Sequence, residues 1–213
     1  NEVALRAVLD RIGSEDIDAV VCAGDVVGYG PDPSVCVDLV REACSVVVAG
    51  NHDRQIADPD RYAGHPTAGP GLAHAASELD DERTEWLLSL PAEAEAADGA
   101  VRVVHSHPDP SSRGRYVYPD DFERVAGAVD DDVLVLGHTH VQGSETVDGT
   151  TVVNPGSVGQ PRDGDPEAAY AVVDTAAGTV TLSRVPYRID RARERIREAG
   201  LPRETGRRLE EAT

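Results

Sequence analysis

The sequence of 213 residues has no lysine and no methionine, and it holds one tryptophan and one phenylalanine. All 20 basic residues are therefore arginines, and 39 acidic residues bring the formal net charge to −19. Such acidity repels nucleic acids and anionic membranes over long range, so it disfavours a general electrostatic attraction to either. The charge is spread along a chain that is 40% apolar, which argues against an acidic disordered tail. We instead predict adaptation to high salt, where screening removes self-repulsion.

Long apolar runs and paired cysteine motifs are also absent. No run approaches eighteen apolar residues and no leader of the secretory type is seen, so we expect neither a membrane span nor secretion. Cys22, Cys36 and Cys44 lie in apolar segments without the spacing of metal sites, which is typical of buried thiols in a reducing cytoplasm. We expect a cytoplasmic protein with a single domain over residues 1–213.

The first part of the chain alternates helical periodicity with short apolar runs. Helices are expected near residues 5–12, 36–43, 71–78, 80–90 and 120–128, and buried strands at 17–23, 45–49, 101–104 and 133–136. This alternation predicts crossover units with parallel strands. After residue 140 the pattern changes to strands separated by glycine-containing turns, which favours hairpins. These strands are expected at 142–147, 150–153, 168–173 and 179–184, loops at 54–70 and 109–118, and two helical pieces over 189–211.

Polar motifs follow four of the predicted buried strands. They are Gly24-Asp25, Gly50-Asn51-His52-Asp53, His105-Ser106-His107-Pro108 and Gly137-His138-Thr139-His140. Because the carboxyl ends of parallel strands open into one crevice, we expect these side chains to converge. The oxygen and nitrogen donors among them form a set without thiolates, which suits Mn, Zn, Fe, Ni or Co. The candidate metal ligands are Asp25, Asn51, His105, His138 and His140.

These motifs, extended through Gly28-Tyr29-Gly30-Pro31 and joined by Asn154-Pro155-Gly156-Ser157-Val158-Gly159, resemble the calcineurin-like metallophosphoesterase superfamily. The likeness is strongest to its small prokaryotic branch of phosphodiesterase-like proteins, and it covers nearly the whole chain in the right order. It implies an α/β fold, namely a four-layer α/β/β/α sandwich of two mixed sheets. The segment 154–157 itself reads best as a tight structural turn.

The resemblance also implies roles for individual residues. Asp25 would be shared by two divalent metal ions, with Mn²⁺ as the first expectation and Zn, Fe, Ni or Co as alternatives. Asn51, His105 and His138 would complete one metal site, and His140 would belong to the other. His52 matches the histidine that lies over the substrate, where it binds the phosphoryl oxygen or protonates the leaving group. Asp53 would orient His52, and the nucleophile would be a water or hydroxide between the metals, its pKa lowered to roughly 7.

The sequence departs from the family pattern in two places. The family begins with a strand and an Asp-x-His motif, neither of which is present here, so only Asp25 and His140 would remain for the second metal. We expect that this first strand is missing because the sequence starts downstream of it, rather than through evolutionary loss. The second departure is His105-Ser106-His107-Pro108, which makes His107 a rival ligand, although the register of the motif favours His105.

These observations predict a metal-dependent phosphoesterase, more suited to diesters than to phosphoproteins, that acts on a small phosphate ester. We expect no membrane partner and disfavour nucleic acid, and the oligomeric state stays open. One alternative is a binding scaffold without catalysis, as in the retromer subunit that shares this fold; another is a regulatory protein that binds nucleotides without turnover. The presence of His52 argues against the scaffold. Arg113, Arg115 and Arg162 are candidate contacts for an anion, but in a chain whose only basic residue is arginine a solvated surface role is favoured for each of them.

Overall fold

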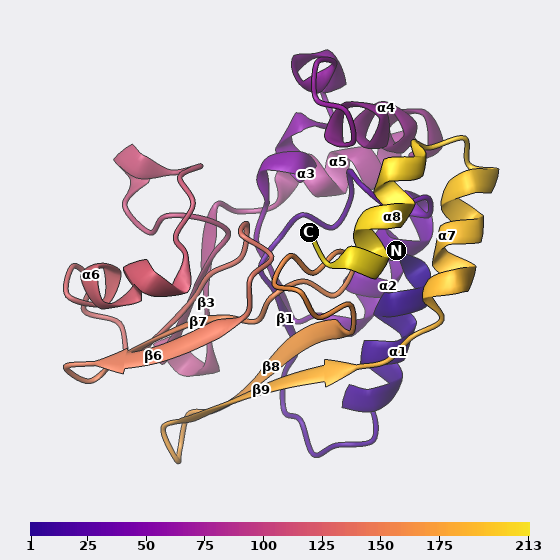
Figure 1. Ribbon diagram of the computed structural model, residues 1–213. Coiled ribbons are helices and arrows are strands. Elements are labelled where there is room, and N and C mark those ends of the chain that lie inside the picture. The colour runs from indigo at the N-terminus through magenta and orange to yellow at the C-terminus, as the bar shows by residue number, and fades with distance from the viewer.

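The largest sheet has five strands in the order β3–β4–β5–β7–β6 in the computed structural model, which describes residues 1–213 (Figure 1). Its central strands β4, β5 and β7 run parallel, and the edge strands β3 and β6 pair antiparallel with their neighbours. The strands are β3 Glu93–Ala96, β4 Val101–Val104, β5 Val133–Val135, β6 Gly143–Val147 and β7 Thr150–Asn154. The parallel centre places the carboxyl ends of β4 and β5 at one edge, where the predicted histidine motifs begin.

A second layer consists of two separate strand pairs, β1–β2 in parallel and β8–β9 in antiparallel orientation. Their bounds are β1 Val21–Cys22, β2 Val46–Val47, β8 Ala168–Asp174 and β9 Thr179–Val185. Val21 of the first pair and Ala171 of the second pack against one apolar cluster that contains Val103 and Val135 of the large sheet. Both pairs therefore lie on the same face of the five-stranded sheet.

Helices cover the two outer faces. Phe122 of α6 packs with Leu134 on the outer face of the five-stranded sheet. Leu87 of α5 packs with Val37 of α2 and with Ala49, which follows β2, and α1 packs against β8. The helices are α1 Glu2–Ile12, α2 Pro33–Ala43, α3 Asn51–Gln55, α4 Ala68–Glu78, α5 Asp81–Ser89, α6 Phe122–Ala126, α7 Ile189–Glu198 and α8 Arg203–Glu211. The predicted α/β/β/α arrangement is thus confirmed.

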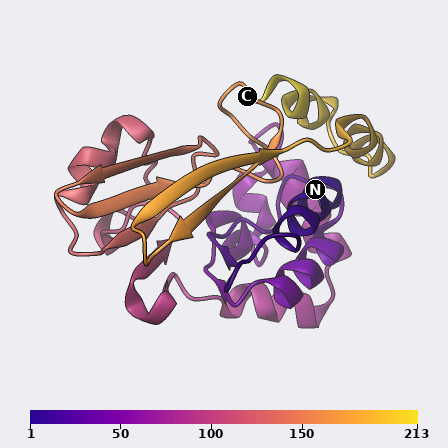
Figure 2. The same cartoon turned by 90° about the horizontal axis from the view of Figure 1, so that it is seen from below.

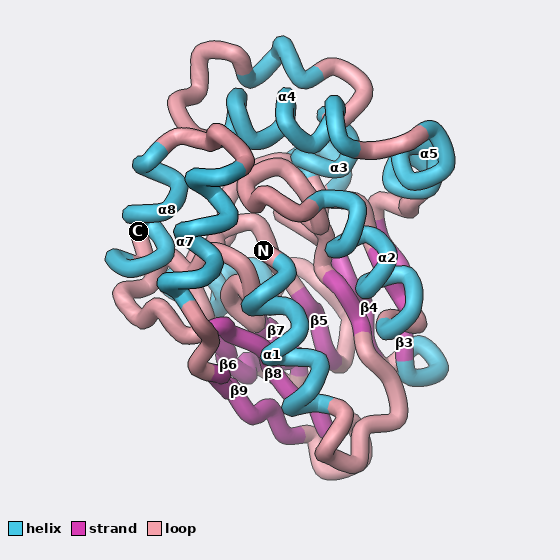
Figure 3. Tube along the Cα trace, turned by 90° about the vertical axis from the view of Figure 1, so that its right-hand side faces the viewer, coloured by secondary structure: helices cyan, strands magenta, loops and turns pink.

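The views from other sides show how the halves of the chain are distributed. Figure 2 shows the helices of the first half gathered on one side of the β8–β9 hairpin, with α6 on the far side of the five-stranded sheet. Figure 3 shows α1 lying in front of the strands, with α7 to its left and α2 to its right. No helix combines the length and the apolar character that crossing a membrane requires.

The elements expected from the sequence differ from the structure in several places. The strands expected over 17–23 and 45–49 pair only at Val21–Cys22 and Val46–Val47, and helix α4 begins at Ala68, inside the expected loop 54–70. Strand β3 and helix α3 were not expected. The sequence of β3, Glu93-Ala94-Glu95-Ala96, alternates in burial as an edge strand does, but it lacks the β-branched residues that indicate a strand. Helix α3 is one turn long and carries mostly polar residues, so it shows no apolar periodicity.

Candidate active site

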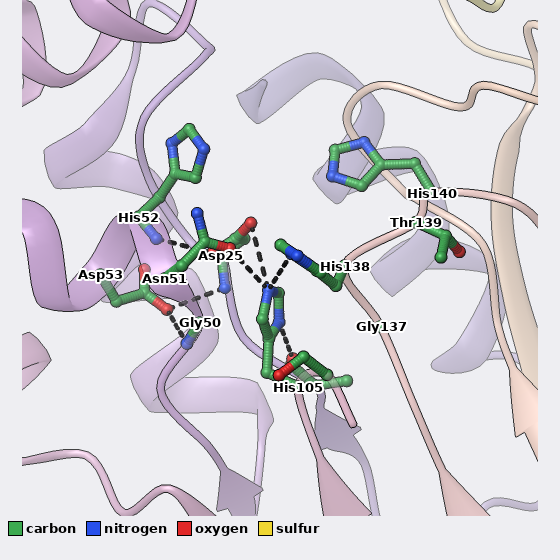
Figure 4. Close-up of polar contacts among 12 residues, drawn as sticks. Asp25, Gly50, Asn51, His52, Asp53, His105, Gly137, His138, Thr139 and His140 are labelled. Atoms are coloured by element: carbon green, nitrogen blue, oxygen red, sulfur yellow. Dashed lines mark hydrogen bonds and ion pairs between the residues drawn. The ribbon is translucent and has the colours of Figure 1, made fainter. Parts of the chain in front are cut away.

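Four of the five predicted metal ligands converge where strands end. Asp25 follows β1, Asn51 begins α3 just after β2, His105 follows β4, and His138 follows β5. Figure 4 shows their side chains pointing toward a common centre. We call these four residues the ligand cluster.

The atoms of the ligand cluster lie close enough to share one cation. His105 Nε2 is 3.1 Å from Asn51 Oδ1, 3.2 Å from His138 Nδ1 and 3.4 Å from Asp25 Oδ2. One donor atom each from Asp25, His105 and His138 lies within 4.8 Å of the other two. The set holds two nitrogens and two oxygens and no thiolate, which suits a divalent metal of the Mn-to-Zn series.

The hydrogen bonds behind the cluster determine which ring nitrogen is free. His105 Nδ1 lies 2.7 Å from the carbonyl of Ala23, and His138 Nε2 lies 3.2 Å from the carbonyl of Gly114. Because a carbonyl only accepts, each of these nitrogens carries the proton, and the other nitrogen of each ring keeps its lone pair. Asn51 Nδ2 donates to the hydroxyl of Tyr62 at 3.0 Å, which turns Oδ1 toward the centre.

Four lone pairs therefore face one another, and such an arrangement repels itself unless a positive charge lies between them. Burial would lower the pKa of His105, yet the Asp25 carboxylate raises it overall, because a negative charge stabilises a positive one beside it. Burial and the nearby His105 lower the pKa of His138 to about 4, so its imidazole is neutral and able to act as a ligand. The residues present thus fit a metal ion.

The backbone at this site is held in an unusual conformation. Asp25, His138 and His140 have φ angles of 55°, 68° and 60°, in the left-handed region that side chains other than glycine rarely adopt. Strain of this kind concentrates at functional sites, where the surrounding structure maintains it. At Gly50 a β-carbon would lie 2.0 Å from Asp25 Oδ1, so only glycine lets the two loops approach.

Asp53 has a different role from the one predicted. Its carboxylate accepts hydrogen bonds from the backbone N–H groups of Asp25, Val26 and Gly50 at 2.8–2.9 Å, and from that of Val27 at 3.3 Å. It makes no hydrogen bond to His52, so the expectation that it orients His52 was wrong. Asp53 instead ties the loop that carries Asp25 to the start of α3, and it is fully buried.

His52 lies beside the ligand cluster without entering it. Its backbone N–H donates to Asp25 Oδ1 at 2.9 Å (Figure 4). Its ring packs on Tyr29 with centroids 4.5 Å apart and lies 5.5 Å from the ring of Tyr62. The side chain is 3% exposed, and burial lowers its pKa, which favours the neutral imidazole. Two tyrosines thus hold the ring in one position next to Asp25.

The remaining two histidines of the motifs lie apart from the cluster. His107 Nδ1 accepts a hydrogen bond from the backbone of Asp109, so the structure places His105 and not His107 among the clustered ligands. His140 Nδ1 lies 2.7 Å from the carbonyl of Gln160, which leaves its Nε2 unprotonated. Burial and the charge of Arg162 lower the pKa of His140 to about 3. Its assignment to a second metal stays a prediction.

Sequence reasoning missed four residues that shape the site. Tyr29 and Tyr62 hold His52, and Tyr116 stacks on the ring of His138 with centroids 4.2 Å apart at an angle of 10°. Asn154 is fully buried and donates to the carbonyl of Gly137 and to Thr139 Oγ1, so it fixes the turn that carries His138. A usable signal was available, because an aromatic-poor chain placed three tyrosines in polar loops near the motifs.

Known proteins resemble this chain in sequence and in fold. The sequence profile of the calcineurin-like phosphoesterase superfamily domain matches residues 1–178. An uncharacterised protein from Methanocaldococcus jannaschii is 31% identical over 98% of this chain and 93% of its own length. The crystal structure of a metallophosphoesterase from Sphaerobacter thermophilus superposes with a TM-score of 0.83 at 34% identity, covering 99% of this chain and 94% of that one. A hypothetical protein from Pyrococcus horikoshii shares the fold, with a TM-score of 0.87, 22% identity and coverage of 100% and 94%.

Proposed function

The chain belongs to the calcineurin-like phosphoesterase superfamily, and from this membership we propose that it is a metal-dependent phosphodiesterase that hydrolyses small phosphate esters. Membership supports phosphoester hydrolysis in general. The convergence of the ligand cluster on His105 Nε2 is the observation that supports the dependence on metal. The preference for diesters rests on the resemblance of the motifs to the phosphodiesterase-like branch.

The residues of the ligand cluster would hold the first divalent ion, and Asp25 with His140 would contribute to a second. A bound divalent ion supplies Lewis-acid chemistry, since it polarises a phosphoryl oxygen and lowers the pKa of water. The protein's own part is to keep the donor atoms free. Backbone carbonyls hold the N–H of each imidazole, and Asp53 fixes the loop of Asp25.

His52 is placed to act on the substrate. Its ring is held between Tyr29 and Tyr62, and its main chain is bonded to the Asp25 carboxylate, so it stands next to the position of the metal without acting as a ligand. The imidazole N–H can donate to a phosphoryl oxygen or to the leaving oxygen. Proton transfer to the leaving group is worth about 10²–10⁴-fold in rate.

The test uses metal-free protein, which is prepared by treatment with a chelator followed by removal of the chelator. We expect no hydrolysis of bis(p-nitrophenyl) phosphate until Mn²⁺ is added, and slower hydrolysis of p-nitrophenyl phosphate, which is a monoester. His105→Ala should lose both metal content and turnover. His107→Ala is the matched control, because His107 lies outside the cluster, and it should keep both. Wild-type protein that binds Mn²⁺ but hydrolyses neither compound with any divalent ion would reject the enzyme in favour of the scaffold.

A further inference from the structure

The arginines of this acidic chain are mostly neutralised, with two exceptions near the site. Twelve of the 20 form ion pairs with Asp or Glu. Six of the other eight are exposed to solvent, where water compensates the charge. Only Arg162 and Arg208 are both partly buried and without a carboxylate partner. We call these two the arginine pair.

Arg162 lies over the aromatic ring that holds His52. Its guanidinium carbon is 5.3 Å from the centroid of Tyr29, on the loop that follows the β7 strand. Its backbone N–H donates to the carbonyl of His140 at 3.0 Å, and its side chain donates to Gln160 Oε1 at 3.0 and 3.3 Å. Gln160 is 3% exposed, so the guanidinium is held firmly beside His140 and Tyr29.

Arg208 belongs to the C-terminal helix α8, which packs beside this place, since Thr205 and Leu209 of α8 line one small hollow together with Tyr29 and Gln160. The Nε of Arg208 donates to the carbonyl of Thr213, and its Nη1 lies 3.5 Å from Thr67 Oγ1. The backbone N–H of Gly164 donates to the carbonyl of Ala212 at 3.1 Å, which ties the loop of Arg162 to the end of α8. Burial lowers the pKa of Arg208, and the charge of Arg162 lowers it further.

Two like charges in partly buried positions are unfavourable unless something negative accompanies them. Arg162 uses its Nε and Nη2 on a single oxygen of Gln160, so further N–H groups of its guanidinium remain for another acceptor. Arg113 and Arg115 were the other candidate anion contacts in the sequence. In the structure Arg113 is paired with Glu93, and Arg115 is exposed. The basic charge at this site therefore has two sources. Arg162 lies on a loop within the matched domain of residues 1–178, and Arg208 lies on a helix beyond that domain.

We propose that the arginine pair binds a second anionic group of the substrate, so that the substrate is a phosphate ester carrying another phosphate beyond the scissile one. This inference rests on the proposed function, since it places the second group next to His52 and the ligand cluster. Guanidinium groups match phosphate oxygens in bidentate geometry, which makes a phosphate the group that this pair fits best.

Sulfate binding to metal-free protein tests the pair without any turnover. We expect calorimetry to show one sulfate site in the wild type. Arg162→Gln and Arg208→Gln should each raise the dissociation constant about tenfold or more, as expected when a hydrogen bond to a charged group is lost. Arg207→Gln is the matched control, because Arg207 is exposed and pairs with Glu204, and it should bind as the wild type does. No sulfate binding, or equal weakening by Arg207→Gln, would overturn the proposal, with circular dichroism confirming that each variant is folded.

A pair of chromogenic substrates tests the link to catalysis. Thymidine 5′-(p-nitrophenyl phosphate) carries one phosphate, and the same compound with a 3′-phosphate carries a second. We expect the Mn²⁺-loaded wild type to favour the second compound about tenfold in kcat/KM, and Arg208→Gln to remove that preference. Equal kcat/KM values in the wild type would refute the second-anion site. Specific sulfate binding in a protein that hydrolyses neither compound would uphold the anion site and refute the proposed phosphodiesterase.

Discussion

The ligand cluster and the arginine pair are neighbours that the chain builds in different ways. Each residue of the cluster stands at or just beyond the end of a strand, β1, β2, β4 or β5, inside a short motif with a glycine or a polar neighbour. The arginine pair comes from the loop after β7 and from α8, two segments joined by a single backbone hydrogen bond between Gly164 and Ala212. The metal chemistry is therefore local to strand ends, whereas the proposed recognition of a second anion depends on how the C-terminal helix packs.

This contrast separates two losses that an activity assay alone would merge. Damage to the cluster should remove metal and turnover but leave sulfate binding intact. Damage to the arginine pair should remove sulfate binding and the preference between substrates while the metal content stays the same. A variant that changes only one of these two sets of properties supports two separable sites, and a variant that changes both indicates a single cooperative site.

Among variants outside the ligand cluster, His52→Ala should have the largest effect. If His52 donates a proton to the leaving group, turnover should fall by about 10²–10⁴-fold. Because His52 contributes only its backbone N–H to Asp25, metal content should stay at the wild-type level, and so should sulfate binding. Steady-state kinetics with metal analysis by mass spectrometry measures both. His74→Ala, a histidine on α4 bonded to the carbonyl of Pro31, is the control and should retain turnover.

Metal lost together with activity in His52→Ala would show that His52 supports the cluster rather than the substrate. His52 would then count among the residues that maintain the metal site, and not among those that act on the substrate.

Asp53→Ala should produce the next largest effect, on stability. Asp53 accepts four backbone N–H groups in a fully buried position, and breaking a buried charged network of this kind costs about 3–5 kcal/mol. The loop of Asp25 would lose its anchor, so metal affinity should fall by about 10–100-fold, as for other residues that orient ligands. Urea denaturation and competition with a chelator measure the two quantities.

The exposed Asp18→Ala serves as the control for Asp53→Ala, with a change within about 0.5 kcal/mol. Sulfate binding by folded Asp53→Ala protein should match the wild type, since the arginine pair does not touch Asp53. Equal loss of metal and sulfate affinity would show that the two sides of the site are one cooperative unit.

The sequence predicted the cluster better than its surroundings for a physical reason. Glycine and polar residues directly after apolar runs indicate strand ends, and parallel strands bring their ends together, so Asp25, Asn51, His105 and His138 followed from local patterns. Asp53 shows the limit of this reasoning. A carboxylate beside a histidine suggests an orienting pair, but the folded loop offers it four backbone N–H groups instead.

The arginine pair shows the same limit over a longer range. Nothing in the sequence near Arg208 distinguishes it from Arg207, its neighbour on α8. The difference arises in the packing of α8, which leaves Arg207 paired with Glu204 and turns Arg208 toward Thr67. The splitting of the second β-layer into two strand pairs is likewise a matter of packing, which periodicity does not report.

The smallest expected effect is the response to salt, and it has opposite signs on the whole surface and on the arginine pair. With a net charge of −19, the compact state repels itself more than the unfolded chain does, so KCl should raise the melting temperature. A gain of 1–2 kcal/mol corresponds to a few degrees, about 2–4 °C for each kcal/mol in a chain of this size. The same salt competes with sulfate and screens the guanidiniums, so sulfate should bind more weakly. Thermal denaturation and calorimetry between 0.1 and 2 M KCl measure the two trends.

A triple variant removes three exposed acids that form no ion pairs, by Asp16→Asn, Asp18→Asn and Glu42→Gln. Its melting temperature should rise less with KCl than that of the wild type, while the effect of KCl on its sulfate affinity should be unchanged. A melting temperature that does not depend on KCl would contradict the expected adaptation to salt. Salt would then act on this chain only through the binding of sulfate to the arginine pair.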